Sequence, residues 1–70
     1  MRLYDLLSVM LMCENVTVDC TGVRVFSGTV ETLFKTKRMR HYMNHKVVEV
    51  ASIGFDVCDS IIIIDISLDK

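Results

Sequence analysis

The spacing of hydrophobic residues changes along the chain, and each spacing is typical of one kind of secondary structure. Between residues 3 and 12 the apolar positions fall on one stripe of a helix if each residue turns about 100°. They are Leu3, Leu6, Leu7, Met10 and Leu11. Between residues 15 and 20 apolar and polar residues alternate, with Val16, Val18 and Cys20 on one side. The pattern predicts an amphipathic helix over 3–12 and a half-buried strand over 15–20.

Two hairpins follow from the same pattern. Thr21-Gly22 predicts a turn, and residues 23–27 return as the second strand of the first hairpin. Residues 46–53 are rich in valine and predict a third strand, which is followed by turn-forming residues over 54–59. The isoleucine-rich segment 60–68 then predicts a fourth strand that pairs back antiparallel.

The two faces of this isoleucine strand differ, because side chains alternate across a strand. Ile62, Ile64, Ile66 and Leu68 share one face, which we expect to lie in the core. Ile61, Ile63, Asp65 and Ser67 share the other face. Half of the second face is apolar, so we expect another element or another subunit to cover it.

Residues 29–45 carry two apolar stripes that do not align. Val30, Leu33 and Phe34 form the first, and Met39, Tyr42 and Met43 form the second. Nine residues separate the starts of the stripes, which rotates a helix by about half a turn, so one straight helix buries only one of them. We therefore predict a break near residues 35–37, with Thr29 as the cap of the first helical piece.

These elements predict one small α+β domain over residues 1–70, with the order α-β-β-α-β-β. The four strands are expected to form an antiparallel sheet made of two hairpins. The N-terminal helix and the broken central helix are expected to cover one face of that sheet.

The composition is more apolar than so small a core easily hides, which favours a homo-oligomer. The chain has 70 residues, of which 51% are hydrophobic, and its mean hydropathy is +0.42. Domains of this size bury only about 60% of the unfolded surface. Ile61 and Ile63 are therefore the candidate interface residues. The alternative is a monomer in which helices cover both faces of the sheet.

A cluster of positive charge lies between residues 35 and 46, although the formal net charge is only −1. No acidic residue interrupts the chain between Glu31 and Glu49. Basic side chains beside a tyrosine suit phosphate contacts and base stacking, so this segment is the candidate nucleic-acid site. The alternative is a solvated helix face. The candidate residues are Lys35, Lys37, Arg38, Arg40, Tyr42 and Lys46.

Metal and redox chemistry have weaker support. His41 and His45 are four residues apart, a spacing that places two ligands on one side of an α-helix. The three cysteines, Cys13, Cys20 and Cys58, form no close pair, and we expect all three to be buried thiols in a reduced, cytoplasmic protein. We predict no resident metal, no cofactor and no membrane span.

The sequence contains no motif of nucleophilic catalysis and no phosphate-binding glycine loop. Asp56, Asp59 and Asp65 are acidic, but the first two lie in a predicted turn, where aspartate is common for backbone reasons. No small-molecule substrate is evident. We therefore expect a non-enzymatic interaction or assembly module, with nucleic-acid binding as the alternative.

Two resemblances accompany these patterns. The first is carried by residues 3–7, Val16-Thr17-Val18, Gly22, Phe26-Ser27-Gly28, Leu33, Val47-Val48 and the strand from Ile61 to Ile66. In these residues the chain resembles small proteins encoded by phages and mobile elements of Gram-positive bacteria, which implies an accessory protein with no assigned activity.

The first half is also similar to Sm-like barrels, in which an N-terminal helix precedes strands of related rhythm. The second half lacks the Asp and Asn of the first Sm motif and the Arg-Gly of the second. The RNA contacts of that family therefore have no counterpart residues in this chain.

Overall fold

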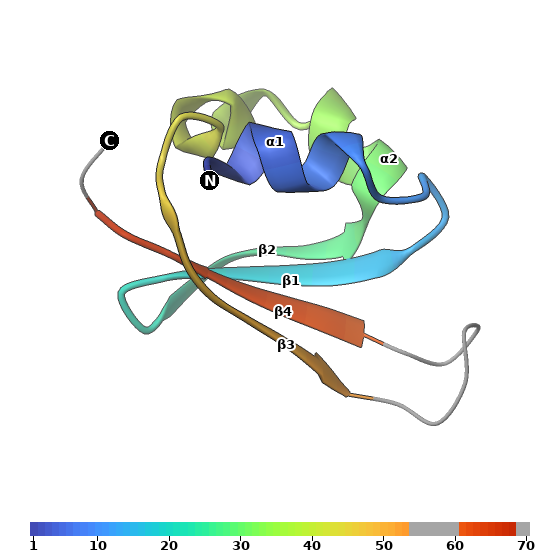
Figure 1. Ribbon diagram of the computed structural model, residues 1–70. Helices are drawn as coiled ribbons and strands as arrows, with labels where there is room; N and C mark the ends of the chain where they lie inside the picture. Colours follow the sequence, from blue (N-terminus) through green and yellow to red (C-terminus); the bar gives the residue numbers. More distant parts are fainter. Residues whose placement is uncertain (54–60, 69–70) are drawn as a thin grey trace.

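The computed structural model describes residues 1–53 and 61–68 and shows a small α+β fold. A sheet forms one layer and short helical segments form the other (Figure 1). In chain order the elements are α1 (Leu3–Ser8), β1 (Asn15–Cys20), β2 (Val23–Thr29), α2 (Val30–Lys35), the 3₁₀ helix η1 (Lys37–Tyr42), β3 (Val47–Ile53) and β4 (Ile61–Ile66). This sequence of elements matches the predicted order, with the central helix in two pieces.

The sheet is mixed, and the prediction of a purely antiparallel sheet was wrong. Its strand order is β2-β1-β4-β3. The two predicted hairpins pair antiparallel within themselves, but β1 and β4 lie side by side and run parallel. The segment from α2 to η1 carries the chain from one edge of the sheet to the other, as a parallel pair requires a long connection. The apolar strand β4 thereby gains a central position, where burial stabilises it most.

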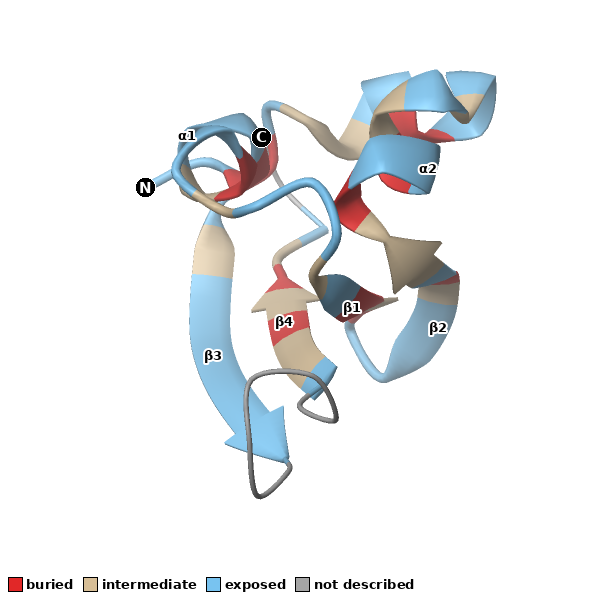
Figure 2. Ribbon diagram, turned by 90° about the vertical axis from the view of Figure 1, so that its right-hand side faces the viewer, coloured by how far each residue is buried: buried red, intermediate tan, exposed pale blue. Residues whose placement is uncertain are grey.

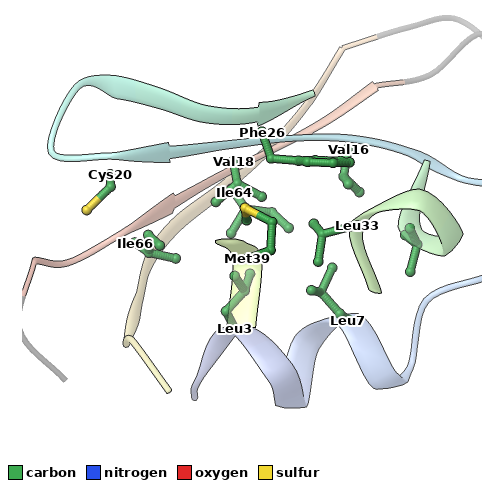
Figure 3. Packing of buried hydrophobic residues seen from close by; sticks show 11 residues of the cluster. Leu3, Leu7, Val16, Val18, Cys20, Phe26, Leu33, Met39, Ile64 and Ile66 are labelled. Atoms are coloured by element: carbon green, nitrogen blue, oxygen red, sulfur yellow. The ribbon is translucent and has the colours of Figure 1, made fainter. Parts of the chain in front are cut away.

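The core lies between the sheet and the helical layer. Leu3 and Leu7 point from α1 toward Met39 and Leu33 (Figure 3), and all four side chains are fully buried. The sheet contributes alternate residues of its central strands and one residue of β2. These are Val16, Val18, Cys20, Ile64, Ile66 and Phe26. The predicted core face of the isoleucine strand is therefore confirmed for Ile64 and Ile66, but Leu68 lies beyond β4 and is exposed.

The first helix is shorter than the predicted span of 3–12 and ends at Ser8. The chain turns early because residues 12–14 bond to the start of α2: Val30 N donates to Glu14 O at 3.0 Å, and Glu31 N donates to Met12 O at 3.1 Å. These bonds satisfy amide groups that have no partner within α2. As a consequence Leu11 lies outside the helix and is exposed.

Backbone geometry confirms the first turn and the helix break. Thr21 and Gly22 both have positive φ, 50° and 87°, as the two central residues of a type I′ hairpin turn require. Thr36 is extended between α2 and η1. The Thr29 side chain accepts a bond from Thr32 N at 3.2 Å and caps α2. The two pieces can therefore each turn an apolar stripe toward the sheet.

The N-terminus is tied to the chain before β3. Arg2 pairs with Lys46 in an antiparallel bridge, and Val47 N donates to Met1 O at 2.9 Å. On the other side of this segment, Ser67 N donates to Lys46 O at 2.9 Å. Three distant parts of the sequence thus run together beside the helical layer.

The remaining expectations concern cysteines, the last turn and membranes. Cys20 is buried as expected, whereas Cys13 is exposed. Its position in the turn after α1 leaves Cys13 outside the core. The predicted turn over 54–59, with Asp56, Cys58 and Asp59, lies outside the described residues. Within residues 1–53 and 61–68, no helix is long and apolar enough to cross a membrane.

Candidate functional site

The predicted basic segment does not form one continuous surface, because the structure divides it among three places. Lys35 ends α2 and pairs with Glu31, with Nζ 3.2 Å from Oε1. Lys46 lies past η1 in the bridge to Arg2. The other four candidates, Lys37, Arg38, Arg40 and Tyr42, all belong to η1.

Because η1 is a 3₁₀ helix, these side chains point in three different directions. Such a helix has three residues per turn, so residues three apart lie one above the other. Met39 and Tyr42 form one line, and both pack in or against the core. Arg38 and His41 form the second line, and Lys37 and Arg40 form the third. The cationic residues are therefore divided between two sides of η1.

Arg38, His41 and Tyr42 line a surface pocket of about 320 Å³ together with Arg24 and Val25 of β2. We call this the arginine pocket. It brings a cation from the first hairpin to the basic helix, although fourteen positions separate Arg24 from Arg38. Arg24 and Val25 were not predicted as site residues, and His41 was considered only as a candidate metal ligand.

Strand β2 has a β-bulge at the residues that line this pocket. Phe26 pairs with Val18, whereas Asp19 pairs with Arg24, so Val25 is the extra residue of β2. Bulges bend a strand and change the direction of neighbouring side chains. This bulge was not predicted, although the consecutive apolar residues Val25 and Phe26 interrupt the alternation of residues 23–27.

Arg24 also faces a carboxylate. Its Nε lies 3.6 Å from Asp19 Oδ1, while the Arg24 side chain remains 66% exposed. That oxygen is buried and accepts no hydrogen bond from the residues that the structure describes, so the contact with Arg24 is electrostatic. Because the Arg24 side chain is largely exposed, the pair holds it weakly and leaves its guanidinium accessible to an anion.

Asp19 belongs to an acidic row that crosses the sheet. It pairs in register with Asp65 of β4, and Asp65 pairs with Glu49 of β3. Directly opposite residues of neighbouring strands lie on the same face. The row therefore lies on the face opposite the core. Within the described part of the chain, no three His, Cys, Asp or Glu side chains are grouped so that they could hold a metal ion.

The two histidines occupy different environments. His41 lies in η1 and is exposed, whereas His45 follows η1 and is buried. The His45 Nδ1 atom donates to the carbonyl oxygen of Ser67 at 2.7 Å, and its ring lies 5.4 Å from the Tyr42 ring. Because η1 is not an α-helix, the four-residue spacing does not place the two rings on one line. His45 thus joins the end of η1 to the end of the sheet.

The predicted interface residues lie on the sheet face opposite the core, where none of the described helices lies (Figure 2). Ile61 is 43% exposed, and Ile63 is half-buried. Strand β3 beside them is exposed from Val48 to Ile53 (Figure 2). Val50 is 48% exposed although its partner in register, Ile64, is fully buried. The helical layer therefore does not cover β3 on the core side either.

Comparisons with protein-family models, with curated proteins and with solved structures find no match. The resemblances to phage and mobile-element proteins and to Sm-like barrels stay predictions.

Proposed function

We propose that the protein is a non-enzymatic interaction module that assembles with a second copy of itself through β3. The observation that supports this most strongly is the exposure of β3 at the edge of the sheet. An edge strand has a row of backbone groups that another strand can pair with, and proteins usually cover or shorten such edges. Strand β3 has seven residues and is exposed over the last six.

The residues of β3 suit antiparallel pairing with an identical strand. Two copies of one strand pair about a two-fold axis, which closes a dimer. With the axis at Val50, Glu49 lies opposite Ala51 of the second copy, so the single charge of β3 does not meet itself. The bulge of β3 lies between Val47 and Glu49, and the register from Glu49 to Ile53 is regular. Pairing with a second copy requires a regular strand, and residues 49–53 provide one.

Apolar exposure beside this edge also supports a second copy as the occupant. Val48, Val50 and Ile53 of β3 are 67%, 48% and 61% exposed, and Ile61 lies in register with Ile53. The core of a 70-residue chain supplies little stability. Burial of apolar surface against another copy therefore adds stability that the monomer lacks. The proposed interface therefore includes Ile61, with the half-buried Ile63 behind it.

Sedimentation equilibrium over micromolar to millimolar protein tests this assembly. We expect the weight-average mass to rise from the 8.0 kDa of one chain toward twice that value. The rise should follow a monomer–dimer equilibrium, because pairing about a two-fold axis is closed. A mass that stays at one chain over the whole range would contradict the proposal.

The basic helix η1 supports a second candidate function, binding of single-stranded nucleic acid. Lys37, Arg38 and Arg40 lie within four residues of η1, and Arg24 adds a cation from β2. Tyr42 lines the same pocket and offers an aromatic wall for a base. This candidate uses the helical layer and is independent of the β3 edge.

A salt titration of oligonucleotide binding tests the second candidate. With about four phosphates neutralised on a single strand, affinity should fall roughly fiftyfold between about 50 and 200 mM salt. Fluorescence anisotropy of a labelled single-stranded DNA and of the matching RNA measures this slope. The lack of any binding at the lowest salt concentration would rule this candidate out.

A further inference from the structure

We propose that the arginine pocket is a binding site for one nucleotide, which enters either as a free mononucleotide or as one unit of a single-stranded nucleic acid. This inference gives the second candidate function a defined subsite, and it does not depend on assembly through β3. It is carried by the residues of β2 and η1 that line one pocket: Arg24, Val25, Arg38, His41 and Tyr42.

The cations of the pocket suit a phosphate group. A guanidinium presents several N–H donors in a planar fork that matches phosphate oxygens. Arg38 lines the pocket from η1 and Arg24 lines it from β2. The Arg24 Nε atom lies near Asp19, but the Arg24 side chain is 66% exposed, so its terminal N–H groups can turn toward a phosphate that Arg38 also binds. His41 lies three residues after Arg38, on the same line of the 3₁₀ helix, and adds a polar ring.

The other walls suit a planar ring. Tyr42 supplies an aromatic side chain, and Val25 supplies an apolar one. Both pack against the core, which holds them in place. Bases stack on aromatic side chains whatever their identity. The volume of about 320 Å³ is near the lower end for small-molecule sites and is suited to a single nucleotide.

The residues around the pocket favour a polyanionic strand that extends beyond it. Asp19 is the carboxylate that contacts Arg24, and it neutralises only part of the local charge. Lys37 and Arg40 lie outside the pocket, on the third line of η1, and are exposed. A nucleic acid strand could place one nucleotide in the pocket and its neighbouring phosphates near these two residues.

Titration of the full chain with nucleotides, followed by two-dimensional NMR, tests the pocket. We expect adenosine monophosphate to give saturable shifts in the amides of Arg24, Val25 and residues 38–42. Adenosine and inorganic phosphate should each bind at least roughly tenfold more weakly, because each lacks one half of the recognised chemistry. Equal binding of phosphate alone would overturn the assignment to a nucleotide.

Matched variants separate the pocket from general electrostatic attraction. Arg38→Gln removes a pocket cation, whereas Arg40→Gln removes an exposed cation on another side of the same helix. Both variants lower the net charge by one and leave the core intact. We expect roughly tenfold weaker binding of adenosine monophosphate for Arg38→Gln and less than about twofold for Arg40→Gln. Equal losses in the two variants would overturn the pocket.

An oligonucleotide of about ten nucleotides distinguishes the two sources of the ligand. Binding of both the oligonucleotide and the mononucleotide, each weakened by Arg38→Gln, supports a subsite for one unit of a strand. Mononucleotide binding alone supports the pocket and contradicts the nucleic-acid candidate. Oligonucleotide binding without saturable mononucleotide shifts contradicts the pocket and leaves that candidate in place.

Discussion

Substitution of Leu7 by alanine is expected to remove a large part of the stability of this fold. Leu7 of α1 is fully buried and packs in the core. A buried Leu→Ala change costs about 2–5 kcal/mol in free energy of unfolding, because it removes apolar contacts and leaves a cavity. At about 0.05–0.15 kcal/mol per residue, the whole domain has roughly 3.5–10 kcal/mol. Thermal and urea denaturation followed by circular dichroism should show a fall in midpoint of more than about 10 °C.

Leu11→Ala is the matched control for Leu7→Ala. The sequence pattern places both leucines on one helical stripe, but the structure ends α1 at Ser8 and leaves Leu11 61% exposed. The same change of side chain should therefore alter the free energy of unfolding by less than about 0.5 kcal/mol. Similar losses in the two variants would show that the helix continues to residue 12 and that α1 is longer than described.

Val50→Lys is expected to dissociate the proposed dimer while the monomer stays folded. Val50 is 48% exposed at the middle of the edge strand β3. With the two-fold axis at this residue, two lysines face each other, and like charges directly opposite each other destabilise strand pairing. If each lysine costs about 1 kcal/mol in free energy of association, the dissociation constant of the dimer should rise roughly thirtyfold. Sedimentation equilibrium measures the dissociation constant, and circular dichroism reports the fold.

Val23→Lys controls for the effect of a charge on an edge strand. Val23 lies in β2, the other edge of the sheet, and is 64% exposed. The same substitution there should leave the dissociation constant within about twofold of the parent protein. If Val23→Lys dissociates the dimer and Val50→Lys does not, assembly uses β2 and the proposed interface is wrong.

Local patterns in the sequence predicted most of the secondary structure. Alternation located β1 at residues 15–20, and the Thr21-Gly22 pair predicted a turn that needs two positive φ angles. The phase change between the apolar stripes that start at Val30 and Met39 predicted the break between α2 and η1. Each of these features depends on residues that are neighbours in the sequence, so a short window contains the required information.

The candidate site was predicted only in part. The basic residues of η1 were visible as a run of charge, and Arg38 and Tyr42 do line the arginine pocket. Arg24 was missed because its approach to η1 depends on the bulge in β2 and on the path of the chain across the sheet. Lys35 and Lys46 were included because they are close in sequence, although α2 and the bridge to Arg2 place them elsewhere.

The sequence by itself determined which segments are helical or extended and which apolar residues could form a core, because both follow from local backbone preference and side-chain periodicity. Only the tertiary structure decided that β4 lies between β3 and β1, parallel to the latter. Strand pairing across 40 or more residues is set by which faces can be buried together, and no local pattern contains that choice. The same choice places β3 at an open edge and brings Arg24 to the basic helix.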